Sequence, residues 1–235
     1  MTRRPRALPV VVAAAILAGC GSSPAASTRP VPVPRSADQL YAAYVTALRA
    51  ARSEHYTGTV TFSDGTTLRL EVTATQTTAH LVAHSEGLAI EEVVVGGHVY
   101  QRGGGHGPDW VELPADEAQA AEALTMQREA DCAAHEHGTL RLGPPTRIGG
   151  RAVATIVDDG AGLGAAPQDS YVSLDSPVHL VRVVQTGPER AGGSAACGHE
   201  PGPVAVSATV DYDSFDSSVQ ITPPPDAADL NAQTA

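Results

Sequence analysis

The sequence has 235 residues, of which 42% are hydrophobic, a composition that excludes a wholly disordered chain. All 15 basic side chains are arginines, and they are set against 26 acidic residues. If residues 1–19 are removed in maturation, 12 arginines remain and the formal net charge becomes −14. Such a surface repels phosphates, so nucleic acid is not expected as a partner, and the charge is expected mainly to keep the protein soluble.

Residues 1–19 have the organisation of a lipoprotein signal peptide. A short basic segment precedes an apolar run over 8–18, which is too short to span a bilayer as a helix. The run ends in Leu-Ala-Gly-Cys, a lipobox whose Cys20 would receive a diacylglyceryl group and become the first residue after cleavage. The alternative is an ordinary secretory signal with a chance cysteine. We expect a cell-membrane protein, anchored through Cys20 by acyl chains such as palmitate and facing the extracytoplasmic side.

A flexible tether is expected after the lipidated cysteine. Residues 20–36 are rich in serine and proline and lack the apolar periodicity of a folded segment. In a largely extended form the tether would reach ~45 Å at ~3.1 Å per residue. We expect one folded domain over 37–229 and a short tail over 230–235.

Two cysteines remain beyond the lipobox. Cys132 and Cys197 form an even pair in an oxidising compartment, which predicts a disulfide between them. The alternative is a metal site that uses Cys132 and His135, which would share one helix face.

Two helices are predicted. Ser36 and Gln39 fit a capping box, and a stripe of apolar residues at helical spacing then predicts a helix over 37–52. Residues 114–135 predict a second helix, with Pro114 at its first position. This second helix is rich in alanine, so it either packs closely or leaves space beneath it.

The rest of the domain alternates with a period of two, which predicts about ten strands connected mainly as a meander. An Asp-Gly pair at 64–65 favours a tight hairpin turn. The expected strands cover 57–62, 67–74, 78–85, 88–95, 98–102, 110–113, 139–142, 151–158, 170–174, 179–186 and 204–213, with a short further strand at 219–222.

No constellation in the sequence predicts catalysis. His80 and His84 lie in a predicted strand, where four residues span ~13 Å, too far for one ion. The glycine-rich loop at 103–107 lacks the features of a phosphate loop. We find no nucleophilic side chain that the sequence places with a general base. The sequence therefore predicts no enzyme, no cofactor and no metal.

Three passages, taken in order, resemble one family of proteins. The first is 94–100 followed by 110–114, the second is 171–175 followed by 178–182, and the third is 210–215 followed by 219–224. With the lipobox, the tether and the alanine-rich helix, they are similar to the LolA-like half-barrel lipoproteins, especially the LppX/LprG-type envelope lipoproteins of high-GC Gram-positive bacteria.

This resemblance implies an α+β fold, a curved antiparallel half-barrel of about ten strands with helices on its concave side. It also implies a cavity that binds or transfers a lipid or another apolar ligand, with helix 114–135 as part of its lid. The candidate pocket residues are Phe62, Leu68, Leu70, Val72, Ile90, Val93, Val95, Leu124, Val181 and Val183. The alternative is a non-enzymatic module with a filled core that binds another envelope protein as a sensor or regulator.

Overall fold

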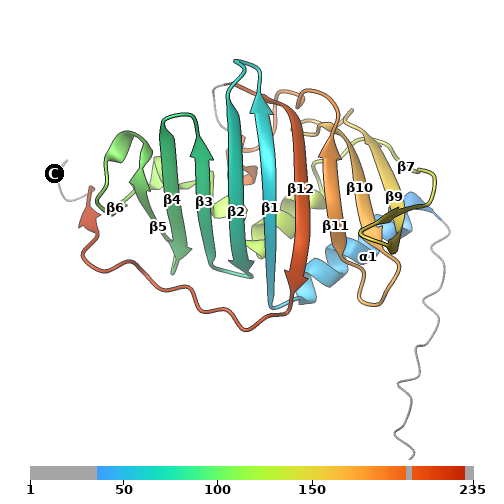
Figure 1. The fold of residues 1–235 in the computed structure, drawn as a ribbon, viewed down its shortest axis with the longest axis horizontal. Helices are drawn as coiled ribbons and strands as arrows, with labels where there is room; N and C mark the ends of the chain where they lie inside the picture. The colour runs from blue at the N-terminus through green and yellow to red at the C-terminus, as the bar shows by residue number, and fades with distance from the viewer. Residues whose placement is uncertain (1–35, 200–202, 231–235) are drawn as a thin grey trace, which may run out of the picture. The chain divides into compact units, whose positions relative to one another are not determined.

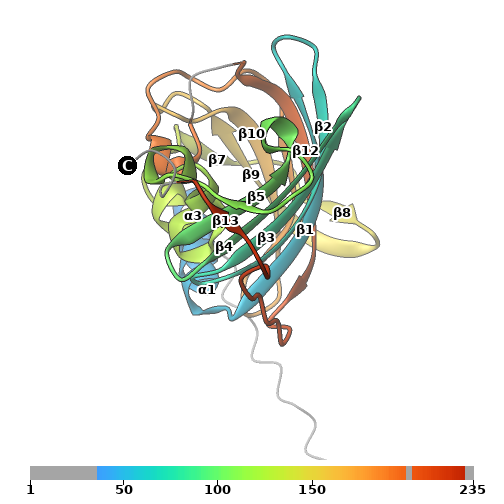
Figure 2. The same cartoon turned by 90° about the vertical axis from the view of Figure 1, so that its left-hand side faces the viewer.

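The structure, a computed structural model, describes residues 36–199 and 203–230. The predicted signal peptide, Cys20, nearly all of the tether and most of the tail lie outside these residues. The described residues form one large curved sheet with helices against its concave face, as Figures 1 and 2 show. None of the helices within them combines the length and the apolar character that crossing a bilayer requires.

The described part of the sheet has 13 strands, more than the ten or so predicted. The strands are β1 Ser53–Phe62, β2 Thr67–Thr75, β3 Ala79–Ser85, β4 Leu88–Val95, β5 His98–Gly103, β6 Val111–Glu112, β7 Leu140–Leu142, β8 Thr146–Ile148, β9 Arg151–Asp159, β10 Pro167–Ser173, β11 Leu180–Gln185, β12 Ala205–Phe215 and β13 Ala228–Asp229. The helices are α1 Ala37–Ala50, α2 Ala115–Ala118 and α3 Met126–Ala133, with the 3-10 helices η1 Gly104–His106, η2 Ala121–Leu124 and η3 Ala195–Cys197.

Two meanders meet at the centre of the sheet. The spatial order is β13-β6-β5-β4-β3-β2-β1-β12-β11-β10-β9-β7, so β1 and β12 join the two halves. Neighbouring strands are antiparallel except for β13, which pairs with β6 in parallel. Because β13 and β7 lie at opposite ends of this order, the sheet of the described residues is open, and the predicted half-barrel is confirmed.

Helix α1 forms where the capping pattern predicted it. The Ser36 hydroxyl accepts a hydrogen bond from the Gln39 N–H at 3.2 Å. Leu40, Tyr44 and Leu48 follow at intervals of four and lie buried on one face of the helix. The sequence prediction for 37–52 is confirmed to within two residues.

The second predicted helix is broken. Thr125 is extended, with φ −79° and ψ 141°, so η2 ends and α3 begins at this residue. Its N–H and its hydroxyl both donate to the Glu122 carbonyl, at 3.1 and 2.9 Å, in place of continuing helical bonds. Pro114 is the N-cap of α2 rather than its first helical residue. The continuous helix over 114–135 is therefore corrected to three short pieces.

The predicted strand at 219–222 is absent from the described chain. Asp216 has φ 58° and ends β12, and three prolines without N–H groups follow at 223–225. The chain resumes pairing only at β13. Neither β13 nor β8 was predicted, because each has only two or three residues, too few to show a period.

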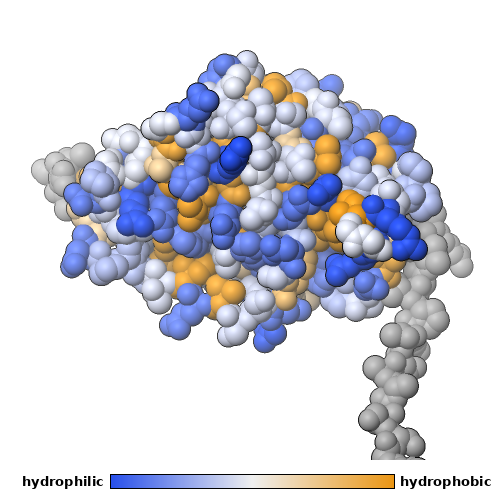
Figure 3. Space-filling view, viewed as in Figure 1, coloured by the Kyte–Doolittle hydropathy of each residue, from blue (hydrophilic) through white to orange (hydrophobic). Residues whose placement is uncertain are grey.

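The outer face of the sheet is mixed in character. Figure 3 shows hydrophilic and hydrophobic residues interspersed over it. Arg182 donates to Asp211 at 2.6 Å across neighbouring strands, and Arg102 donates to Glu91 at 2.7 Å. These paired charges keep the outer face compatible with water and leave the concave face to form the core.

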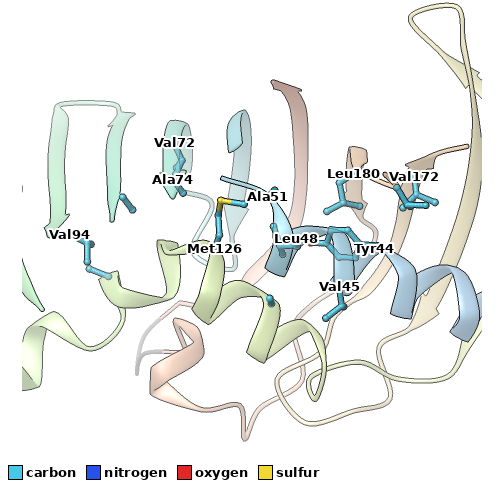
Figure 4. Close-up of a cluster of buried hydrophobic side chains, with 14 of the residues drawn as sticks. Tyr44, Val45, Leu48, Ala51, Val72, Ala74, Val94, Met126, Val172 and Leu180 are labelled. Carbon is cyan, nitrogen blue, oxygen red and sulfur yellow. The ribbon is translucent and has the colours of Figure 1, made fainter. Parts of the chain in front are cut away.

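The core lies between the concave face and the helices. Figure 4 shows Met126 of α3 pointing toward Val72 and Ala74 of β2. Met126 and Ala74 are fully buried. Further along, Tyr44 of α1 lies near Leu180 of β11. This second contact region borders the cavity described next.

Candidate ligand-binding cavity

A cavity of about 300 Å³ lies between the helices and the second half of the sheet. Its sheet wall comes from β10, β11 and β12, and its other walls come from α1, α3 and the loop that carries the second cysteine. The lining residues are Tyr41, Tyr44, Ala123, Glu129, Cys132, Ala133, Glu136, Gly164, Gln168, Ser170, Leu180, Val183, Cys197, His199, Val210 and Tyr212. A volume of this size lies at the lower end of the range for ligand pockets, roughly 300–1,000 Å³.

The wall has an apolar and a polar part. Leu180, Val183 and Val210 are contributed by β11 and β12, and Val183 pairs directly with Val210. The polar part carries tyrosine hydroxyls, the carboxyls of Glu129 and Glu136, and one histidine. This combination suits a ligand that has both an apolar portion and a polar group.

One carboxyl lines the polar part of the cavity, and a second carboxyl lies beside it. Glu129 on α3 lines the cavity and accepts a hydrogen bond from the Tyr44 hydroxyl at 3.0 Å. Glu54 on β1 lies close to it and is only 1% exposed. Burial, and then the charge of Glu129, raises the pKa of Glu54 well above its ordinary value of 4.5.

One buried and two partly buried tyrosine rings surround these carboxyls. The rings of Tyr56 and Tyr212 lie 5.1 Å apart, on neighbouring strands β1 and β12. Burial, and then the negative charge of nearby glutamates, raises the pKa of Tyr44, Tyr56 and Tyr212 well above the ordinary value of 10.0. These phenols therefore stay neutral and present hydroxyl donors and ring faces.

A histidine holds the loop over the cavity. His199 Nδ1 lies 2.6 Å from Glu189 Oε1, and its Nε2 lies 2.7 Å from Glu136 Oε2. Burial lowers the pKa of His199, but the hydrogen bonds and charges of the two glutamates outweigh it and raise the pKa above 6.5. The ring bridges the chain after α3 to the loop after β11, and the two glutamates favour its protonated form.

The predicted disulfide is confirmed. Cys132 at the end of α3 is bonded to Cys197 in η3, with the two Cα atoms 5.7 Å apart. The two sulfurs and Glu136 also lie within 4.8 Å of one another, a grouping that could hold a metal ion only with free thiolates. The oxidised pair instead fixes the loop to the helix beside the cavity.

The strand pairing places the predicted pocket residues on both faces of the sheet. Leu68, Leu70, Val72, Ile90 and Val183 share the concave face by register. Since successive residues of a strand point to opposite faces, Val93 and Val95 lie on the outer face, and the prediction that they line the same pocket as Ile90 is corrected.

Of the ten predicted residues, Val183 alone lines the cavity. Leu124 in η2, Leu70 and Val72 pack into the apolar core. Ile90 borders a separate hollow of about 300 Å³ near β3, β4 and β5. Phe62 and Val181, both half-buried, lie beside irregularities in the strand register.

Sequence reasoning missed most of the polar lining. Tyr41 and Tyr44 were recognised only as part of a core-facing helical stripe, and Glu129 lies in a helix too short to show a polar stripe. The alternation in β1, which puts Glu54 and Tyr56 on the concave face, is the signal that could have revealed the polar residues beside the cavity. His80, weighed as a metal ligand, instead lies 2.9 Å from Glu91.

No protein-family model and no curated protein matches this sequence. Among solved structures, LprF from Mycobacterium bovis is similar, with a TM-score of 0.50 and 15% sequence identity over 80% of this chain and 96% of LprF. The lipoprotein LppX from Mycobacterium tuberculosis gives a TM-score of 0.49 at 15% identity, over 79% of this chain and 99% of LppX.

This chain and LprF share a fold. The resemblance to the LppX/LprG-type lipoproteins noted in the sequence is therefore confirmed at the level of the α+β half-barrel. At this low identity the likeness does not carry over a ligand, so the function has to be argued from the cavity itself.

Proposed function

We propose that the protein is an extracytoplasmic binding protein that takes a small amphiphilic lipid, or another partly apolar ligand, into the cavity between the sheet and helices α1 and α3. The observation that carries this proposal is the cavity of about 300 Å³ with an apolar wall on β11 and β12 and a polar wall opposite. Its modest volume favours a ligand with one short chain over a bulky multi-chain lipid.

The proposal makes the protein a carrier or receptor rather than an enzyme. The polar groups of the cavity are mostly engaged with one another, as in the pairs of Tyr44 with Glu129 and of His199 with Glu136. In the pair of Tyr44 with Glu129, burial raises the pKa of the phenol well above 10.0, which opposes its activation as a nucleophile. Binding through shape and a polar anchor accounts for the arrangement without a chemical step.

We also propose an extracytoplasmic location with a lipid anchor on Cys20. The Cys132–Cys197 disulfide supports an oxidising compartment, and the Leu-Ala-Gly-Cys sequence at residues 17–20 supports the anchor. Metabolic labelling with an alkyne analogue of palmitate tests the anchor. The wild-type protein is expected to be labelled and the Cys20→Ala variant to be unlabelled; equal labelling of both would overturn the anchor.

Lipid analysis of the purified protein tests the binding function. The full chain with Cys20→Ser would be made in an oxidising compartment and purified without detergent. Native mass spectrometry is expected to show a stoichiometric ligand of lipid mass, which extraction would identify. A mass without bound ligand, and no uptake of added short-chain amphiphiles, would overturn the carrier function. The remaining function would then be a module with a filled core that binds a protein partner.

A further inference from the structure

The buried Glu54 carboxyl has a second carboxyl, that of Glu129, as its neighbour. The residue lies near the start of β1 on the concave face, opposite the fully buried Ala74 of β2. It is 1% exposed, and among the described residues its carboxyl oxygens accept no hydrogen bond from an N–H or a hydroxyl, so the Glu129 carboxyl is left to share a proton with it. Buried carboxyls are nearly always paired with a donor or a cation, so a carboxyl whose partner is a second carboxyl requires a specific reason.

A second carboxyl raises the energetic cost of a negative charge at this site. Glu129 lies close enough for its charge to act on Glu54, and it forms part of the cavity wall. Two carboxylates so close together cannot both ionise in an apolar interior unless a cation lies between or beside them.

The described residues supply no such cation. No arginine is among the residues that line the cavity. Arg128 on the same helix lies by Glu122, and Arg49 of α1 pairs with Asp131 at 3.1 Å. His199, which does line the cavity, is held between two other carboxylates.

Aromatic faces complete the surroundings. Tyr44 and Tyr212 line the cavity, and Tyr56 packs against Tyr212 behind it. Ring faces attract organic cations, and recognition of ammonium groups commonly combines several aromatic rings. An ammonium group therefore matches both the missing charge and the rings around it.

We propose that the ligand of the cavity carries an ammonium group, held by the Glu129 carboxylate and the rings of Tyr44 and Tyr212, with the Glu54 carboxylate beside Glu129 and the apolar chain of the ligand along Leu180, Val183 and Val210. This assignment rests on the proposed binding function and narrows it to cationic amphiphiles. Without the ligand, the two carboxyls retain a proton between them. Binding of the cation lets both ionise, and the proton leaves to solvent.

Three probes of equal chain length test the assignment: decylammonium, decanol and decanoate. Each would be titrated calorimetrically at pH 7 into the full chain carrying Cys20→Ser. Decylammonium is expected to bind at least about 30-fold more tightly than decanol, with decanoate weakest, because only the cation compensates the buried carboxylates. Its binding heat is expected to vary with the ionisation enthalpy of the buffer, reporting release of about one proton.

Matched variants locate the site. Glu54→Gln and Glu129→Gln are expected to weaken decylammonium binding by at least about 30-fold and to change decanol binding little. Glu86→Gln, at an exposed turn, is the control and is expected to bind like the parent protein. Circular dichroism and thermal unfolding confirm that each variant is folded, and binding is compared only between folded proteins.

The possible outcomes distinguish failure of the ammonium site from failure of the proposed binding function. If decanol or decanoate binds as tightly as decylammonium, or if both glutamine variants bind decylammonium normally, the ammonium site is overturned while the binding function stands. If none of the three probes binds and no lipid co-purifies, both fail.

Discussion

The two halves of the concave face are filled in different ways. Under β2, β3 and β4 the inward positions include Ala74 and Ala79, both fully buried, and their small size lets Met126 reach the sheet. Under β10, β11 and β12 a cavity separates Tyr44 of α1 from part of the sheet, and Tyr212 of β12 borders this cavity. We refer to these as the filled half and the open half.

The halves also differ in what holds them together. One apolar cluster runs through both halves, and in the filled half it includes Val72, Ala74 and Met126, which are held mainly by close side-chain packing. The open half is closed by a disulfide, by His199 between two glutamates, and by the Tyr44–Glu129 hydrogen bond. A cavity removes packing contacts, and these polar and covalent links offset that loss beside it.

The largest effect is expected from breaking the disulfide. The cross-link joins residues 65 positions apart, and the chain-entropy relation gives about 4 kcal/mol for a loop of this length. The double variant Cys132→Ser, Cys197→Ser is expected to lose about that much free energy of unfolding, measured by urea denaturation.

Hydrogen exchange shows which part of the double variant loses protection of its amide protons. Protection is expected to fall in α3 and in the loop around η3, while β2 and β3 keep theirs until global unfolding. Equal loosening of both halves would contradict the view that the disulfide serves the open half.

A matched pair of valines compares the halves directly. Val72→Ala removes a side chain that is 1% exposed in the filled half and is expected to cost about 2.5 kcal/mol, from lost burial and a new void. Val183→Ala enlarges a cavity that already exists and is expected to cost only about 1 kcal/mol. Equal losses in urea denaturation would mean that the open half is as tightly packed as the filled one.

The sequence predicts the sheet better than the cavity for reasons visible in single residues. Alternation along β2 marks its inward side chains, and the capping pattern at Ser36 marks the start of α1. Thr125 breaks the second helix through bonds to Glu122 that no period reveals. The cavity depends on residues far apart in the chain, such as Glu54 and Glu129, whose proximity only the folded sheet establishes.

The buried carboxyl gives a smaller effect that depends on pH. Because the pKa of Glu54 is raised in the fold, its contribution to stability is full below its unfolded value near 4.5 and is lost as the pH rises through the raised pKa. Glu54→Gln removes this loss and is expected to stabilise the unliganded protein by about 1 to 2 kcal/mol at pH 8.

Thermal unfolding at pH 4 and pH 8 checks whether Glu54→Gln stabilises the protein at the higher pH. At pH 4 the variant and the parent protein are expected to be nearly equal, because the parent carboxyl is then protonated in both states. A variant that is less stable than the parent at pH 8 would mean that the Glu54 carboxylate has a stabilising partner in the fold.

The smallest effect is expected at His199. Its contribution to stability also falls as the pH rises, but here the fold stabilises a protonated ring and not a neutral carboxyl. Its raised pKa means that the ring's contribution is full below 6.5 and is lost as the pH rises through the folded pKa. His199→Gln is expected to cost about 1 kcal/mol at pH 6 and progressively less at alkaline pH. His84→Gln, an exposed position on the outer face of β3, is the matched control.

Hydrogen exchange across this pH series relates the histidine to the comparison of the two halves. Since His199 bridges Glu136 and Glu189, its deprotonation is expected to loosen the loop beside the cavity and leave β2, β3 and β4 unchanged. Loosening confined to the open half would mean that solution pH controls access to the cavity through the loop. Loosening of the filled half as well would mean that the two halves unfold as one unit and that the loop does not open on its own.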